Sequence, residues 1–267
     1  MRAFAFASAI SLALAGTGAA PAGAAAPRRV ASLNLCTDEL LLLIAAPEQV
    51  ASVTHLAHSP AETPLWRRAR RYMRNDGSLV SVAALKPDLV LTMGGGGRDR
   101  AGIAAKLGQR LVDLPFPERI ADVETAVTRV AAALGRPAAG AALVARIEAL
   151  RRARPSAGAD AIWLGGGGRT VPANGLAAEW MGLAGLSQRA FPGDRVSLET
   201  LLVRPPALLL RSDYRAGQYS GEQAWLRHPL AARARAERTL VADGRLWTCM
   251  GPLMIGEVER LKREAAR

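Results

Sequence analysis

Two cysteines carry the most distinctive chemistry in this sequence, and they lie near its opposite ends. Cys36 follows the first apolar segment after the N-terminal region, and Cys249 lies close to the C-terminus. They form a disulfide if their Cα atoms approach within about 7 Å. The other two interpretations are a pair of unpaired small core residues, and soft sulfur ligands for a metal ion. All three stay open at the level of the sequence.

The histidines offer a second chemistry, because His55 and His58 form a His-x-x-His pair. Together with a thiolate, such a pair binds Zn²⁺ or ligates a haem iron. Pro60 and Pro64 give this segment the composition of a loop, so the spacing does not place both rings on one helix face. We therefore interpret them as exposed loop histidines, expect His228 at a helix end, and predict no resident metal or cofactor.

The sequence contains no motif that predicts catalysis. The glycine runs at 94–97 and 165–168 lack the Lys and Ser or Thr of a phosphate-binding loop, and we interpret them as tight turns. Neither a Ser-His-Asp constellation nor a nucleophile elbow is visible. We expect a protein that is not an enzyme. The alternative is a hydrolase or metal-dependent lyase with paired acid and base groups in a cleft.

The net charge of the chain limits the classes of binding partner that we expect. The 267 residues carry 35 Lys and Arg against 23 Asp and Glu, a formal net charge of +12, and half of them are apolar. The apolar fraction predicts a globular protein. Charge alone is compatible with nucleic-acid binding, but no basic and aromatic platform for stacking bases is present, so no nucleic-acid partner is expected. We interpret the positive charge as a preference for anionic ligands.

The first residues have the features of an export signal. Arg2 precedes an apolar stretch at 4–15, and small residues continue to Ala26. We predict a signal peptide over residues 1–26, because the apolar stretch is too short to span a membrane. The mature chain is expected to be exported and soluble in the periplasm, a compartment that permits a disulfide.

Apolar strands and helices alternate along the rest of the chain, which predicts an α/β fold with mainly parallel sheets. A long helix at 137–154 is expected to join an N-terminal lobe at 27–136 to a C-terminal lobe at 155–267. Thr37 or Asp38 is expected to cap the first helix. The expected strands lie at 29–33, 50–54, 89–92, 110–113, 161–164, 207–210 and 239–241. The other expected helices lie at 78–85, 99–109, 118–134, 176–183, 197–203, 224–235 and 253–267.

The two lobes repeat one pattern. Residues 80–91 align with residues 199–210 without a gap when Pro87 is set on Pro206. In each segment an apolar helix ends near a basic residue and a proline, and a buried strand follows. The repeat predicts two similar α/β lobes.

The chain resembles the substrate-binding proteins of ABC importers for cobalamin, ferric siderophores and haem. The resemblance rests on the order and spacing of four segments, at 29–40, 78–92, 196–199 and 247–252. The first reads Arg-Val-Ala-Ser-Leu-Asn-Leu-Cys-Thr-Asp-Glu-Leu, and the second contains Lys-Pro-Asp-Leu-Val. This resemblance implies capture of a cobalamin-like or iron-chelate ligand and its delivery to an inner-membrane ABC permease. The alternative within the same family is a haem or metal-ion receptor.

The resemblance also implies how the permease is bound, because an acidic residue on each lobe of these proteins meets arginines of the permease. Glu199 is the matching residue of the second lobe, and Val80 stands at the matching position of the first. We therefore expect either that Asp76 or Glu62 takes this role in the first lobe, or that permease docking is lopsided and relies more on the second lobe.

The ligand is expected in the cleft between the lobes, where strand ends meet helix starts and backbone donors face anionic groups. Aromatic and apolar walls with a few arginines suit a large, flat or ringed ligand with carboxylate or phosphate groups. The residues expected there from the first lobe are Asn34, Leu35, Cys36, His55, Tyr72, Arg74, Met93 and Phe116. Those from the second lobe are Arg169, Arg195, Arg211, Tyr214, Trp225, Trp247 and Cys249.

Overall fold

The computed structural model of the chain describes residues 25–94, 97–218, 220–230 and 238–265. The predicted signal peptide, apart from its last two residues, and most of the second half of the helix expected at 224–235 lie outside this description. Within the described residues, no helix is long and apolar enough to cross a membrane.

The first lobe is built on a parallel sheet in which the strand order is β3-β2-β1-β4-β5. Chain order reverses between β1 and β4, so the carboxyl ends of these two strands border the crevice in which such sheets bind ligands. The strands are β1 (Val30–Ser32), β2 (Val50–Thr54), β3 (Met73–Asn75), β4 (Leu89–Met93) and β5 (Arg110–Leu114). The helices are α1 (Leu35–Ile44), α2 (Trp66–Ala69), α3 (Leu79–Ala83), α4 (Gly97–Lys106) and α5 (Ile120–Ala133), with 3-10 turns η1 (Pro47–Gln49) and η2 (His55–His58).

The second lobe repeats this plan, with one edge strand fewer among its described residues. Its parallel strands follow the order β7-β6-β8-β9, so the reversal lies between β6 and β8. The strands are β6 (Ala159–Leu164), β7 (Leu186–Gln188), β8 (Leu208–Ser212) and β9 (Arg238–Ala242). The helices are α7 (Leu176–Leu183), α8 (Leu198–Val203), α9 (Gly221–Leu226), α11 (Leu246–Cys249) and α12 (Met254–Ala265), with turns η3 (Gly166–Gly168) and η4 (Pro192–Asp194).

The predicted repeat is present in three dimensions. Ser78 caps α3 by accepting a hydrogen bond from the Ser81 amide, and Ser197 caps α8 by accepting one from the Thr200 amide. Each helix then leads into a buried strand next to the first strand of its sheet. The expected fold class, two similar α/β lobes with parallel sheets, is confirmed.

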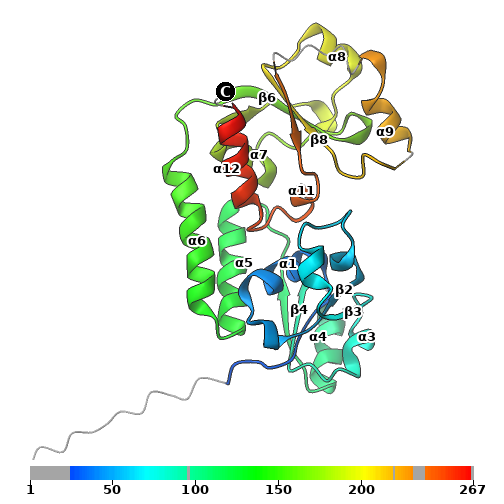
Figure 1. The fold of residues 1–267 in the computed structure, drawn as a ribbon, viewed down its shortest axis with the longest axis vertical. Coiled ribbons are helices and arrows are strands. Elements are labelled where there is room, and N and C mark those ends of the chain that lie inside the picture. The colour runs from blue at the N-terminus through cyan, green and yellow to red at the C-terminus, as the bar shows by residue number, and fades with distance from the viewer. Residues whose placement is uncertain (1–24, 95–96, 219, 231–237, 266–267) are drawn as a thin grey trace, which may run out of the picture.

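Helix α6 (Pro137–Arg152) follows α5 and leads the chain from the first sheet to the second (Figure 1). It packs so closely on α5 that a Cβ atom at Gly140 would lie 2.4 Å from the Cβ of Ala131. One hydrophobic core continues through both lobes, since Leu41 and Val130 of the first belong to the same buried cluster as Trp180 of the second. The lobes are therefore attached to each other over a broad apolar contact.

Three details of the elements differ from the sequence prediction. Helix α1 begins at Leu35, and its N-cap is Asn34, whose side chain accepts from the Cys36 amide. Thr37 and Asp38 lie inside the helix and are buried. Short edge strands β3 and β7 and the one-turn helices α2 and α11 were not expected, because segments of three or four residues carry almost no periodicity. The helix expected to start at residue 224 is observed as α9, which begins earlier, at Gly221, and ends at Leu226.

Candidate functional site

A cavity of about 530 Å³ lies in the second lobe, at the carboxyl ends of β6 and β8. This is the strand reversal of the second sheet, where a ligand site is expected. Its volume is in the range of small-molecule sites. It is lined by Trp163, Gly165, Gly166, Arg169, Thr170, Ser212, Tyr214, Arg215, Gln218, Ser220, Glu222, Gly244, Trp247 and Thr248.

Two indole rings form the apolar wall of this cavity. The ring centroids of Trp163 and Trp247 are 5.9 Å apart and tilted by 45°. Trp247 is only 7% exposed, so its ring is held in place by the core. The Nε1 atoms of both rings are buried without a hydrogen-bond partner among the described residues. A wall of this kind offers a flat apolar ligand a surface to stack on.

Arginines supply the positive charge of the cavity. The Arg169 guanidinium lies 2.9 Å from Glu222 across the mouth, and both side chains are mostly exposed. Arg195 pairs with Arg169 through a backbone bridge and donates to the Gly167 carbonyl. Trp225 packs against Gly168, which has a φ of +73° that a glycine adopts without strain. The glycine run at 165–168 is thus a turn at the rim, as predicted.

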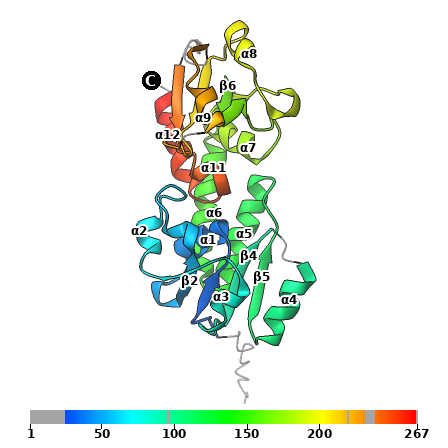
Figure 2. The same ribbon diagram turned by 90° about the vertical axis from the view of Figure 1, so that its right-hand side faces the viewer.

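Cys36 and Cys249 are joined in a disulfide, with their Cα atoms 5.2 Å apart. The structure therefore selects one of the three interpretations of the pair. The bond links the first turn of α1 in one lobe to the end of α11 in the other, and Figure 2 shows α11 where the two lobes meet. Met93 and both cysteines line a small cavity beneath this junction.

The remaining residues expected in the cleft from the first lobe do not line the second-lobe cavity. His55 and Arg74 are exposed and border a separate shallow groove. Leu35 is buried, and Tyr72 is half-buried against the core. Phe116 is exposed, and its ring lies over Gly94.

The His-x-x-His pair lies on the 3-10 turn η2; His55 is exposed as predicted, whereas His58 is half-buried. Partial burial, together with the nearby charges of Arg74 and Arg70, lowers the pKa of His58 below its usual value. Such a histidine stays neutral near pH 7. No group of three or more His, Cys, Asp or Glu that could hold a metal ion is present in the described residues.

The residues considered for docking take different positions. Glu199 is exposed in the first turn of α8, and Val80 is 82% exposed at the matching place on α3. Asp76 is exposed and accepts hydrogen bonds from Ser78 and Ser81, which lower its pKa to about 2. It is therefore a carboxylate available at this end of the first lobe.

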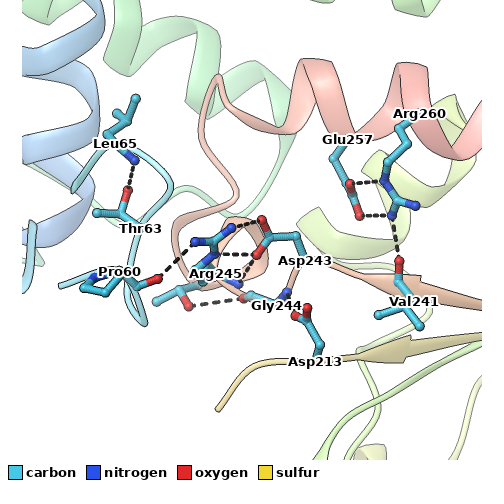
Figure 3. A network of polar contacts seen from close by, with 11 residues as sticks. Pro60, Thr63, Leu65, Asp213, Val241, Asp243, Gly244, Arg245, Glu257 and Arg260 are labelled. Atoms are coloured by element: carbon cyan, nitrogen blue, oxygen red, sulfur yellow. Dashed lines mark hydrogen bonds and ion pairs between the residues drawn. The ribbon is translucent and has the colours of Figure 1, made fainter. Parts of the chain in front are cut away.

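Glu62 is not available for docking, because it is buried and bound by the second lobe. Its carboxylate accepts a hydrogen bond of 2.7 Å from the Tyr214 hydroxyl and pairs with the Arg215 guanidinium at 2.8 Å. In a neighbouring contact, Arg245 is held by two bonds to Asp243 and donates to the Pro60 carbonyl of the first lobe (Figure 3). The loop at 59–65 thus lies against the second lobe beside the cavity.

Among the predicted residues, Arg169, Tyr214 and Trp247 come together at the second-lobe cavity, and Arg195 and Trp225 lie just behind its rim. Arg211 lies on β8 with its side chain exposed. The sequence prediction missed Trp163, Arg215 and Glu222. Trp163 was detectable, because alternation along β6 places its side chain opposite those of Ile162 and Leu164.

Two parallel α/β lobes, a shared core and a cavity at a strand reversal define a two-lobed solute-binding protein. The sequence matches the family model described as periplasmic binding protein over residues 30–239. The chain belongs to this family, whose members bind small-molecule ligands and work with ABC permeases rather than catalyse reactions. The resemblance found in the sequence is thereby confirmed.

Solved structures support the same fold. The haem-binding protein RhuT from Roseiflexus sp. RS-1 has a TM-score of 0.66 and 22% identity, over 90% of this chain and 99% of RhuT. BhuT in complex with two haems has a TM-score of 0.64 and 20% identity, over 89% of this chain and 97% of BhuT. The vitamin B12-binding protein BtuF of Vibrio cholerae has a TM-score of 0.59 and 16% identity, over 89% of this chain and 96% of BtuF. No curated protein matches the sequence significantly.

Proposed function

We propose that this chain is exported to the periplasm, captures a ringed iron chelate that carries carboxylates, and delivers it to an inner-membrane ABC permease. The observation that carries the proposal is the second-lobe cavity, which is lined by two neighbouring indole rings and by Arg169 and Arg215. The rings suit the flat part of such a ligand, and the guanidinium groups suit its carboxylates. Haem is the first compound to test, since RhuT and BhuT are haem-binding proteins.

The proposed ligand class is tested by binding and thermal stability together. Purified mature protein is titrated with haem, ferric siderophores and cobalamin, and the quenching of tryptophan fluorescence and the melting temperature are followed. A ligand at about a hundred times its Kd stabilises the fold by about 2.7 kcal/mol. We expect haem to quench the fluorescence and raise the melting temperature. Binding of cobalamin alone would replace the iron chelate as cargo, and no binding by any of these compounds would refute the proposal.

A further inference from the structure

Glu62 belongs to the first lobe, but both partners of its carboxylate belong to the second. The Tyr214 hydroxyl donates to one oxygen at 2.7 Å, and the Arg215 guanidinium donates to the other at 2.8 Å. Glu62 is 9% exposed, so this is a mostly desolvated carboxylate with a charged and a neutral donor. Two donors of this kind are what a protein uses to bind the carboxylate of a small molecule.

Tyr214 and Arg215 are also lining residues of the second-lobe cavity, so a ligand bound there would lie beside the two residues that hold Glu62. Burial, followed by the neighbouring Glu62, raises the pKa of Tyr214, so its hydroxyl stays protonated and able to donate. The Arg215 guanidinium lies 5.1 Å from the centre of the Tyr214 ring, which ties the two side chains together.

The backbone holds this pair of donors in a fixed place. Arg215 has a φ of +53°, a left-handed conformation that is strained for a residue with a side chain. Gly244 lies directly beneath the turn, and a Cβ atom there would come within 2.3 Å of the Tyr214 Cβ. A strained residue in a tightly packed turn at a cavity is typical of a binding site.

The loop that carries Glu62 is held together mainly by its own bonds. The amides of Glu62 and Thr63 donate to the Ser59 carbonyl, and the Leu65 amide donates to the Thr63 hydroxyl. Its polar ties to the second lobe are the Glu62 carboxylate and the Arg245 bond to Pro60. Thr63 is buried and Leu65 packs on the core, so the C-terminal part of the loop is anchored in the first lobe, while the Cys36–Cys249 disulfide keeps the lobes joined.

We propose that a carboxylate of the ligand competes with Glu62 for Arg215 and the Tyr214 hydroxyl, and that this exchange loosens the contact of the loop at 59–65 with the second lobe. The inference rests on the function proposed above. One carboxylate replaces another, so the guanidinium keeps its counter-charge throughout. A ligand without a carboxylate leaves Glu62 in place, which makes this pair a determinant of specificity.

The test compares Glu62→Gln with the wild type, using haem and its dimethyl ester as probes. Gln keeps an acceptor for Tyr214 but removes the charge that holds Arg215. Because the variant no longer competes, we expect it to bind haem about three- to tenfold more tightly and to bind the ester as the wild type does. The matched control is Glu259→Gln, which removes an exposed ion pair with Arg146 far from the cavity.

Hydrogen exchange of residues 59–65 gives a second readout that does not depend on affinity. We expect faster exchange in Glu62→Gln, and in the wild type after haem but not after its ester. Equal effects of the substitution on both probes, or unchanged exchange of the loop, would overturn the inference. Failure of the wild type to bind haem would overturn the inference for this ligand, whereas the iron-chelate function is refuted only if the ferric siderophores also fail to bind.

Discussion

At the scale of single residues, the clearest contrast is between the two indoles of the cavity wall. Trp247 was predictable, because it belongs to a segment that follows the last strand of the second lobe. Trp163 was missed, because the apolar segment at 161–164 was predicted only as a strand, with no side chain assigned to the cleft. The geometry of β6 separates the two cases. Ile162 and Leu164 face one buried cluster, and Trp163 points the other way, toward Trp247.

Replacement of Trp247 by phenylalanine tests the wall directly. The smaller ring keeps the core filled but loses stacking area, so we expect haem binding to weaken about five- to tenfold. Fluorescence-independent titration by haem absorbance measures the effect. Trp66→Phe is the control, because this indole lies under Arg67 and Arg70 on α2 and away from the cavity. Equal weakening in both variants would argue against stacking on Trp247.

Glu39 makes stability depend on pH. It is buried and accepts from the Leu253 amide of the other lobe, and burial raises its pKa to about 7. Because the pKa of Glu39 is higher in the folded than in the unfolded state, its protonation stabilises the fold at a pH below the unfolded pKa. This contribution to the free energy of unfolding is lost as the pH rises through about 7. We expect the free energy of unfolding to fall between pH 5 and pH 8.

In the variant Glu39→Gln, the decrease in the free energy of unfolding between pH 5 and pH 8 should be smaller by about 2–3 kcal/mol. Chemical denaturation at the two pH values measures it. Asp38 has the same raised pKa of about 7 from burial and continues to titrate in this variant, so part of the fall remains. An identical pH profile in variant and wild type would show that Glu39 does not titrate in this range.

At the scale of elements, the start of α1 shows where sequence reasoning stops. Asn34, Thr37 and Asp38 are all good capping residues, so propensity does not choose among them. Tertiary contacts make the choice. Thr37 bonds to Ser32, and Asp38 accepts from the amide and hydroxyl of Thr54, which leaves Asn34 as the cap. Long helices such as α5 and α6 were predictable because their apolar periodicity does not depend on such contacts.

The two serine caps allow a test of the repeat. We expect Ser78→Ala and Ser197→Ala each to reduce the free energy of unfolding by about 1 kcal/mol. Because the two caps lie in different lobes, their effects on the free energy of unfolding should add in the double variant. Urea denaturation measures all three variants. Thr125→Ala, which removes a hydroxyl bonded to the preceding turn of α5, is a control expected to change little.

At the scale of the whole molecule, the two-lobed plan could be predicted from alternation and from the repeat around Pro87 and Pro206. The way in which the lobes meet could not, because it depends on contacts between residues far apart in sequence. Glu62 is one example, since its side chain was considered for permease docking but lies against Arg215. Cys36 and Cys249 are another, because only the closeness of α1 and α11 decides among the three interpretations.

Loss of the disulfide should affect the molecule as a whole. It closes a loop with a sequence separation of 213 residues. By the loop-entropy relation, removing such a bond costs about 5 kcal/mol. We expect Cys36→Ser with Cys249→Ser, or treatment with a reductant, to lower the melting temperature strongly. A variant that melts like the wild type would show that the shared core alone holds the lobes together.

Permease docking is the last property at this scale. We expect Glu199→Arg to impair uptake in cells without weakening ligand binding, because Glu199 is exposed on α8 and is not one of the residues that line the cavity. Asp76→Arg tests the same role in the first lobe. Uptake assays with each variant, paired with titration of the purified protein, separate the two effects. Normal uptake by Glu199→Arg would remove this assignment.

The disulfide between the lobes also simplifies the biogenesis of the protein. The sequence has two cysteines, so oxidation within one chain yields a single pairing and has no scrambled isomers to correct. Cys36 is synthesised early, and its thiol has no partner within the chain until Cys249 has been made. During that interval its wrong partner is a thiol of another molecule. Faulty maturation should therefore accumulate as covalent dimers, which a non-reducing gel distinguishes from correctly oxidised monomer.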